Sequence, residues 1–267
     1  MMRMAWIGWD PFLRFLAADT FEIRRLSLGP DRMLSWDAIC REFGGQPDVV
    51  VYCDSSLPPP LPGVERFPCL TIFYCVDSHI HDWYPAYAQG FDLCTVSLRD
   101  HLPRFEGRLT RKRLLWLPPM AGAVAPEAFP PEAAKTCDLL FVGKVDPELT
   151  PGRARMLAEL GRRLPGLVVT RGDWRALYPT ARLVLNVAEG GDLNFRVFEA
   201  LSTGACLLTP AVGHGLSELF TNGQHLFTYP AGDAGAIMSL AGELLPDPER
   251  RACVARRGLE EIRARHE

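Results

Sequence analysis

The stretch LVLNVAEGGDLNFRVFEALSTGACLLT, residues 183–209, decides the fold class of this chain. Two short apolar runs, 183–187 and 205–209, flank a segment of helical period that begins near Phe195 and ends at Gly204. Glycine suits this end because it readily adopts the left-handed conformation that closes many helices. A strand, a helix and a second strand in this order are typical of a βαβ unit, so we predict a parallel sheet here.

The same alternation of short apolar runs and helical segments extends over the whole chain. We therefore predict the α/β class, with one parallel sheet covered by helices in each half. A helix is also expected at 246–266, on the surface because its apolar stripe is thin. The expected strands are at 4–7, 22–28, 49–52, 70–74, 93–96 and 114–117 in the first half, and at 139–142, 167–170, 183–187, 205–209 and 226–229 in the second.

A proline-rich stretch separates the two halves. Five prolines fall within residues 118–131, and neither helical nor strand period continues through them. We predict a first Rossmann-like domain over residues 1–118, a linker over 119–135 and a second Rossmann-like domain over 136–267. Open α/β sheets bind ligands at the carboxyl ends of their strands, so we expect a functional cleft between the two domains.

Composition and charge exclude several classes of protein. The 267 residues are 48% hydrophobic and 23% charged, as in ordinary globular proteins, and the formal net charge of −3 offers no footprint for nucleic acid. The eight cysteines form no CxxC pair, which suits small buried side chains in a reducing cytoplasm. No apolar run reaches the roughly 18 residues of a membrane span, so we expect a cytoplasmic protein without a transmembrane segment.

The helix that begins near Phe195 carries a polar face. Arg196, Glu199 and Thr203 are spaced i, i+3 and i+7 and therefore share one side of the helix. The aromatic and aliphatic positions of the same helix are expected to point into the core. These positions are Phe195, Phe198 and Leu201.

Two interpretations of this polar face stay open. In the functional one, the helix N-terminus and Arg196 attract an anion, and Glu199 accepts two hydrogen bonds from a vicinal diol such as a ribose. In the structural one, Asp192 or Asn194 caps the helix, and Arg196 and Glu199 form an exposed ion pair of little energetic weight.

Further phosphate-binding elements follow other strands of the second half. Gly143 and Lys144 come directly after the buried strand at 139–142, and Arg153 lies at the start of the next helix. Together with the helix near Phe195, these groups are suited to a pyrophosphate. The sequence contains neither GxxxxGK[ST] nor GxGxxG, which argues against a P-loop or a simple dinucleotide site.

A glycine turn adds backbone N–H groups after the strand at 205–209. Gly213, His214 and Gly215 form this turn, and a short helix begins near Leu216. Free N–H groups in such a turn are able to cradle a phosphate, although every βα unit needs a turn of this kind.

Ionisable residues also cluster after the strand at 70–74. Asp77, His79, His81 and Asp82 follow it within a few positions, and histidine is the natural side chain for proton transfer near neutral pH. Two other interpretations stay open. His79 and His81 would share a face if the strand continued, as a metal site requires, or all four residues only form hydrogen bonds within a loop.

Several separated blocks resemble the GT-B glycosyltransferases, in particular the bacterial group-1-like subfamily that includes CgeB-type spore-maturation proteins. They occur in the expected order and cover most of residues 70–266. The blocks are VDSHIHDWYPAYAQGFDLCTVSLRDHLPRF (76–105), LLWLPPMA (114–121), GDLNFRVFEALSTGACLLTP (191–210), GLSELFTNGQHLFTY (215–229) and DPERRACVARRGLEEIRARH (247–266).

The resemblance implies the GT-B fold, in which two Rossmann-like domains face each other across a cleft. It implies transfer of a sugar from a UDP-, GDP- or TDP-sugar donor, held by the second domain without a metal or other cofactor. The acceptor, which is a glycan, a protein or a small molecule, would enter against the first domain. Glu199 matches the glutamate on the donor ribose, and His79 matches a D-x-H position that acts as a base or orienter. The positions that match the diphosphate site are Gly143, Lys144, Arg196 and the turn from Gly213 to Leu216.

The sequence departs from the family pattern in two places. The related family-4 pattern has two glutamates separated by seven residues, but counting back from Glu199 reaches Gly191, with Asp192 beside it and Glu189 two positions earlier. We take His79, Asp77 and Asp192 as the catalytic candidates, and count Asn194 with the nucleotide-binding candidates named above. The first domain is also short, so a partner protein is an expectation. Two alternatives follow: a catalytically silent module that binds a nucleotide or a partner, and a nucleotide-sugar epimerase or hydrolase.

Overall fold

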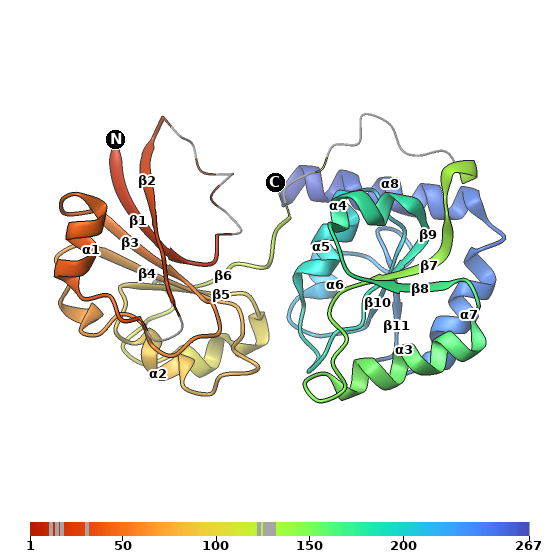
Figure 1. The fold of residues 1–267 in the computed structure, drawn as a ribbon, viewed down its shortest axis with the longest axis horizontal. Coiled ribbons are helices and arrows are strands. Elements are labelled where there is room, and N and C mark those ends of the chain that lie inside the picture. The colour runs from red at the N-terminus through yellow and green to blue at the C-terminus, as the bar shows by residue number, and fades with distance from the viewer. Residues whose placement is uncertain are drawn as a thin grey trace. The chain divides into compact units, whose positions relative to one another are not determined.

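The computed structural model describes residues 1–10, 13, 16, 19–29, 32–121, 124 and 132–266. Within them the chain divides into two compact units, Met1–Pro118 and Pro119–Glu267 (Figure 1). Each unit contains one parallel sheet with helical segments between most successive strands, so the predicted α/β class is confirmed. Most of the predicted linker, at 122, 123 and 125–131, lies outside the described residues.

The first unit is built on a six-stranded parallel sheet. Its strand order is β2-β1-β3-β4-β5-β6, and each neighbouring pair runs parallel. Its strands are β1 (Met2–Gly8), β2 (Phe21–Leu26), β3 (Val49–Cys53), β4 (Leu70–Cys75), β5 (Leu93–Val96) and β6 (Leu114–Trp116). Its helical segments are α1 (Trp36–Phe43), η2 (Val64–Arg66), α2 (Tyr84–Ala88) and η3 (Arg99–Phe105).

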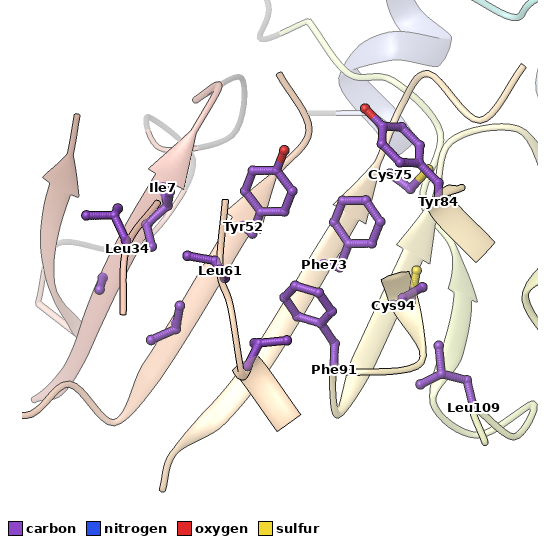
Figure 2. Close-up of a cluster of buried hydrophobic side chains, with 14 of the residues drawn as sticks. Ile7, Leu34, Tyr52, Leu61, Phe73, Cys75, Tyr84, Phe91, Cys94 and Leu109 are labelled. Carbon is purple, nitrogen blue, oxygen red and sulfur yellow. The ribbon is translucent and has the colours of Figure 1, made fainter. Parts of the chain in front are cut away.

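Aromatic rings fill much of the first unit's core. Tyr52 and Phe73 come from the neighbouring strands β3 and β4, and their rings stack with centroids 5.3 Å apart (Figure 2). Tyr84 from α2 meets the Phe73 ring edge-on at 5.5 Å, and Phe91 stacks on Phe73 at 5.4 Å. Helix α2 is therefore fixed beside the carboxyl end of β4, where the ionisable cluster of residues 77–82 lies.

The second unit is built on a five-stranded parallel sheet of order β11-β10-β9-β7-β8. Its strands are β7 (Cys137–Val142), β8 (Leu167–Thr170), β9 (Ala181–Leu185), β10 (Leu207–Pro210) and β11 (Phe227–Tyr229). Its helical segments are η4 (Glu132–Ala134), α3 (Pro151–Arg163), α4 (Trp174–Leu177), η5 (Tyr178–Thr180), α5 (Phe195–Ser202), α6 (Leu216–Leu219), α7 (Ala234–Leu244) and α8 (Pro248–Arg265).

All of the predicted strands are present, with ends that agree to within two residues. The expectation for the last helix was wrong in part, because one face of α8 is buried and packs against α5. Val254, Leu259 and Ile262 are at most 3% exposed. Gly258 permits this close packing: a Cβ atom there would lie 2.8 Å from Leu201 of α5 and 2.5 Å from the carbonyl oxygen of His225.

Candidate functional site

Residues 186–194 carry polar side chains from β9 to the start of α5. Asn194 is the N-cap residue of α5, but its side chain makes no capping hydrogen bond. Its Nδ2 instead donates to Oδ1 of Asn186 at 3.2 Å and to Oδ1 of Asp192 at 3.5 Å. Asn186 in turn donates to Oγ1 of Thr209 at 3.0 Å, in the core. Of the two residues that the structural interpretation offered as the cap, Asp192 or Asn194, the side chain of Asn194 therefore does not cap the helix.

Arg196, in the first turn of α5, lies against the end of β7. Its Nε donates to the carbonyl oxygen of Val142 at 3.1 Å, and its guanidinium lies over the ring of Phe141, 5.6 Å from the centroid. Gly143 makes this approach possible, because a Cβ atom there would lie only 2.8 Å from Nη2 of Arg196. The N–H of Gly143 donates to the carbonyl oxygen of Thr170 at 3.0 Å, so the contribution of Gly143 is the space it leaves.

Arg196 and Glu199 line one hollow of about 320 Å³ at the carboxyl ends of β7, β8 and β9, which we name the carboxyl-edge hollow. Gly143 and Asn194 line it as well, and the Oδ1 atom of Asn194 is buried without a hydrogen-bond partner among the described residues. The remaining walls are largely aromatic. They include Trp174, Tyr178 and Phe195, and Phe195 is half-buried here and does not point into the core as predicted.

Tyr178 contributes a buried phenol to this hollow and is 1% exposed. Burial raises the pKa of Tyr178, the carboxylate of Glu199 raises it further, and Arg196 lowers it. The phenol therefore stays protonated at neutral pH and is a hydrogen-bond donor beside the carboxylate of Glu199. Thr203, the third residue of the predicted polar face, is instead buried and donates to the carbonyl oxygen of Ala200 at 2.8 Å.

The carboxylate of Glu189 caps helix α3. Its two oxygens accept the backbone N–H groups of Gly152 at 3.2 Å and of Arg153 at 3.0 Å. Gly190 and Gly191 have φ angles of 67° and 76°, in the left-handed region that glycine favours. A glutamate at 191 would therefore be strained in this backbone conformation.

Arg153 does not line the carboxyl-edge hollow among the described residues. Its guanidinium donates to the carbonyl oxygens of Val187 at 3.2 Å and Lys144 at 3.1 Å, and the residue is 8% exposed. Burial lowers the pKa of Arg153, and the nearby charge of Arg196 lowers it further. These contacts tie the chain after β7 to the chain after β9, and the diphosphate contact of Arg153 stays a prediction.

Lys144 and the turn from Gly213 to Leu216, which were also predicted to contact a diphosphate, do not line this hollow in the described part of the chain. Lys144 is exposed and pairs with Asp146 at 3.0 Å, and this hydrogen bond lowers the pKa of Asp146. His214 and Gly215 have φ angles of 59° and 88°, so the predicted turn is present. The side chain of Leu216 is buried, and only its backbone faces the turn.

In the first unit, Asp77 and the histidines follow β4 in a turn and not in an extended strand. The backbone oxygen of Asp77 accepts the N–H groups of Ile80 at 2.9 Å and His81 at 3.1 Å. The shared strand face that a metal site required is therefore absent, and no group of three His, Cys, Asp or Glu side chains among the described residues is placed to hold a metal ion. Nδ1 of His79 and Nε2 of His81 are buried without a hydrogen-bond partner there.

Asp54, which the sequence analysis missed, organises this turn. It is 3% exposed, and it accepts the N–H groups of Ser56 at 2.8 Å, Val76 at 3.1 Å and Asp77 at 2.8 Å, together with the hydroxyl of Tyr84. Asp54 directly follows the apolar strand at 49–53. A polar residue in this position was also the pattern that identified Asp77 after the next strand, so the same pattern could have identified Asp54. By contrast, Asp82 is 98% exposed and pairs with Arg104 at 2.9 Å.

A family model described as glycosyl transferase-like matches residues 153–267. The matched segment lies within the second unit and contains Arg196 and Glu199. No sequence among the curated proteins matches the chain.

Solved structures are similar to the chain over both units. HepE from Anabaena in complex with UDP and glucose has a TM-score of 0.68 at 10% identity, over 100% of this chain and 96% of that one. Sucrose-phosphate synthase from Thermosynechococcus elongatus has a TM-score of 0.67 at 13% identity, over 100% of this chain and 95% of that one. TarM of S. aureus has a TM-score of 0.59 at 9% identity over 82% of this chain, which spans about half of TarM, 52%.

These similarities establish the fold, which is that of the GT-B glycosyltransferases, with a Rossmann-like sheet in each unit. The predicted GT-B fold is therefore confirmed, whereas the CgeB-like subfamily stays a prediction. In the described part of the chain, no helix combines the length and apolarity needed to cross a membrane.

Proposed function

We propose that this chain is a glycosyltransferase that moves a sugar from a nucleoside diphosphate donor to an acceptor. The observation that carries the proposal is the carboxyl-edge hollow, where Arg196 and Glu199 of one helix line the same concave surface at the ends of three strands. Open α/β sheets bind their ligands at this edge. The glycosyl transferase-like match over residues 153–267 supports the same activity.

Within the proposal, the carboxylate of Glu199 accepts the ribose hydroxyls, and Arg196 with the N-terminus of α5 holds the diphosphate. UDP is the first nucleotide to consider, because HepE and the pneumococcal O-GlcNAc transferase GtfA are described in complex with UDP. GDP and TDP remain alternatives. Lys144 and the turn from Gly213 to Leu216 are further proposed contacts, and Lys144 would first have to leave its ion pair with Asp146.

The proposed catalysis needs no metal ion. Positive charge on Arg196 and the dipole of α5 would stabilise the diphosphate as it departs. His79 is the proposed base for the acceptor hydroxyl, Asp77 supports the turn that carries it, and Asp192 is the proposed carboxylate near the donor sugar. The free ring nitrogen of His79, buried without a partner among the described residues, is consistent with a proton acceptor.

The test is release of UDP from UDP-glucose and UDP-GlcNAc in the presence of an acceptor panel, with and without EDTA. Transfer should persist in EDTA. Replacing the base in His79→Ala should lower the transfer rate by roughly 10²- to 10⁴-fold while nucleotide affinity is kept. His81→Ala, two residues away in the same turn, is the matched control. Full activity in His79→Ala would remove His79 from the mechanism, and loss in EDTA would contradict the metal-free scheme.

One specific observation favours a second candidate, a nucleotide-binding module without transferase activity. The position of the first family glutamate is Gly191, and the nearby carboxylate of Glu189 is engaged by the N-terminus of α3. If nucleotides bind but no sugar is transferred or released from any donor of the panel, this second function holds.

A further inference from the structure

A second hollow lies at the opposite edge of the same sheet, where the strands begin. We name it the amino-edge hollow; its volume is about 350 Å³. Lys135 precedes β7, Arg182 is the second residue of β9, and Cys206 precedes β10. Helix α8 forms the facing wall. Arg251, Ala252 and Arg256 contribute to this wall from two successive turns of α8.

The wall of this hollow carries more positive than negative charge. Its lining contains four cations, Lys135, Arg182, Arg251 and Arg256, and the carboxylate of Glu132. Glu132 Oε1 accepts from Nε of Arg182 at 3.0 Å and also from Nη2 of Arg251, and Nη1 of Arg182 donates to Asp138 at 2.7 Å, so both guanidinium groups are paired with carboxylates.

Lys135 and Arg256 make no ion pair with a carboxylate among the residues that the structure describes. The ammonium of Lys135 donates to the carbonyl oxygen of Pro179 at 2.8 Å and keeps two further donors. Burial lowers the pKa of Lys135, with Glu132 opposing this and Arg251 adding to it, so an anion nearby would stabilise its charged form. Arg256 is exposed and has no hydrogen bond or ion pair within the described part of the chain.

The volume of the amino-edge hollow suits a small molecule. Its volume is within the roughly 300–1,000 Å³ of small-ligand sites, and the small side chain of Ala252 leaves the space beside Arg256 open. Cys206 does not make it a nucleophilic site, because burial raises the pKa of its thiol to about 12 in spite of the nearby Arg251 and Lys135. The hollow is therefore equipped for binding and not for covalent chemistry.

We propose that the amino-edge hollow binds a small phosphate-bearing molecule, with Lys135 and Arg256 as its direct contacts and Arg182 and Arg251 as supporting charges. Guanidinium and ammonium groups are the side chains that bind phosphate oxygens best. This inference is independent of the proposed glycosyl transfer, because the two hollows lie at opposite edges of the sheet.

The test is calorimetric titration with inorganic phosphate and with pyrophosphate at constant ionic strength. Arg256→Gln and Lys135→Gln should each weaken binding by about tenfold or more, which corresponds to about 1.4 kcal/mol. Arg257→Gln, at the next exposed position of α8 and outside the lining, is the matched control and should bind as the parent does. Arg196→Gln should leave this binding event unchanged, since Arg196 belongs to the carboxyl-edge hollow.

Ala252→Leu separates a shaped site from diffuse positive charge, because it fills the hollow without changing the charge. Binding should be lost in this variant while the unfolding transition is retained. The inference is overturned if phosphate and pyrophosphate do not bind the parent protein saturably. It is also overturned if Arg257→Gln weakens binding as much as Arg256→Gln, or if only Arg196→Gln abolishes it.

Discussion

The turn after β4, in the first unit, and the turn after β9, in the other unit, share a position at the end of a strand and differ in structure. Both bring ionisable residues to the carboxyl end of a buried strand. After β4, the backbone folds around the buried carboxylate of Asp54, and His81 lines a hollow of about 270 Å³ beside the turn. After β9, Arg196 and Glu199 lie on a helix and line a hollow. The element that follows a strand therefore decides how the polar groups are held, by a turn around a buried carboxylate after β4 and on a helix after β9.

The largest effect on stability is expected from a substitution that removes the hydrogen bonds of the turn after β4. Asp54→Ala would leave three backbone N–H groups and the Tyr84 hydroxyl without their acceptor, so we expect a loss of about 3–4 kcal/mol in the free energy of unfolding. Chemical denaturation measures this loss. Asp82→Ala, in the same turn but with an exposed side chain, is the control and should change stability by less than about 1 kcal/mol. Equal effects of the two variants would contradict the role given to Asp54.

A smaller effect, on nucleotide affinity, is expected from a substitution that narrows the carboxyl-edge hollow. The Cβ atom of Gly143→Ala would lie 2.8 Å from Nη2 of Arg196 and 3.2 Å from the ring of Phe141, so the guanidinium has to move. We expect nucleotide affinity to fall by about tenfold, or about 1.4 kcal/mol. Gly161→Ala in α3, where an added Cβ meets nothing within 4 Å, should leave affinity unchanged. Unaltered affinity in Gly143→Ala would separate Arg196 from nucleotide binding.

The smallest effect is expected in the pH dependence of stability, at the contact between α5 and the end of α8. His266 lies between Phe198 of α5 and Phe220, with ring centroids 5.5 and 5.4 Å away, and burial lowers its pKa. As the pH falls, the imidazole of His266 is therefore protonated first in the unfolded chain, near pH 6.5. Below that pH the free energy of unfolding decreases by at most about 1.4 kcal/mol per pH unit. Unfolding free energies at pH 7.5 and 5.5 should differ less in His266→Phe than in the parent. An unchanged difference would exclude His266 as the source.

Local patterns account for what the sequence predicted correctly. Strand positions follow from short apolar runs, and the shared face of Arg196 and Glu199 follows from helical spacing, which depends on neighbours within one turn. Both features depend only on residues close in the chain. The GT-B fold followed from the order of the motif blocks and agrees with the solved structures.

The features that the sequence did not predict depend on contacts between residues that are far apart in the chain. Glu189 caps a helix that begins some forty residues earlier, and Asp54 organises a turn more than twenty residues later. Arg153, expected at a phosphate, is instead buried against carbonyl oxygens. Helix α8 shows the same limit, because the small residue Gly258 allows a close approach to α5 that a thin apolar stripe does not indicate. None of these pairings has a signature within a single segment.

In the proposed function, the carboxyl-edge hollow binds a nucleotide through the carboxylate of Glu199. Calorimetric titration of UDP, GDP, TDP and ADP without added metal, on the parent protein, Glu199→Ala and the exposed control Glu260→Ala, tests it most directly. We expect saturable binding of one nucleoside diphosphate, weakened about 30- to 100-fold in Glu199→Ala, or about 2–3 kcal/mol, and unchanged in Glu260→Ala. Absence of nucleotide binding, or equal affinity in Glu199→Ala and the parent, would contradict it.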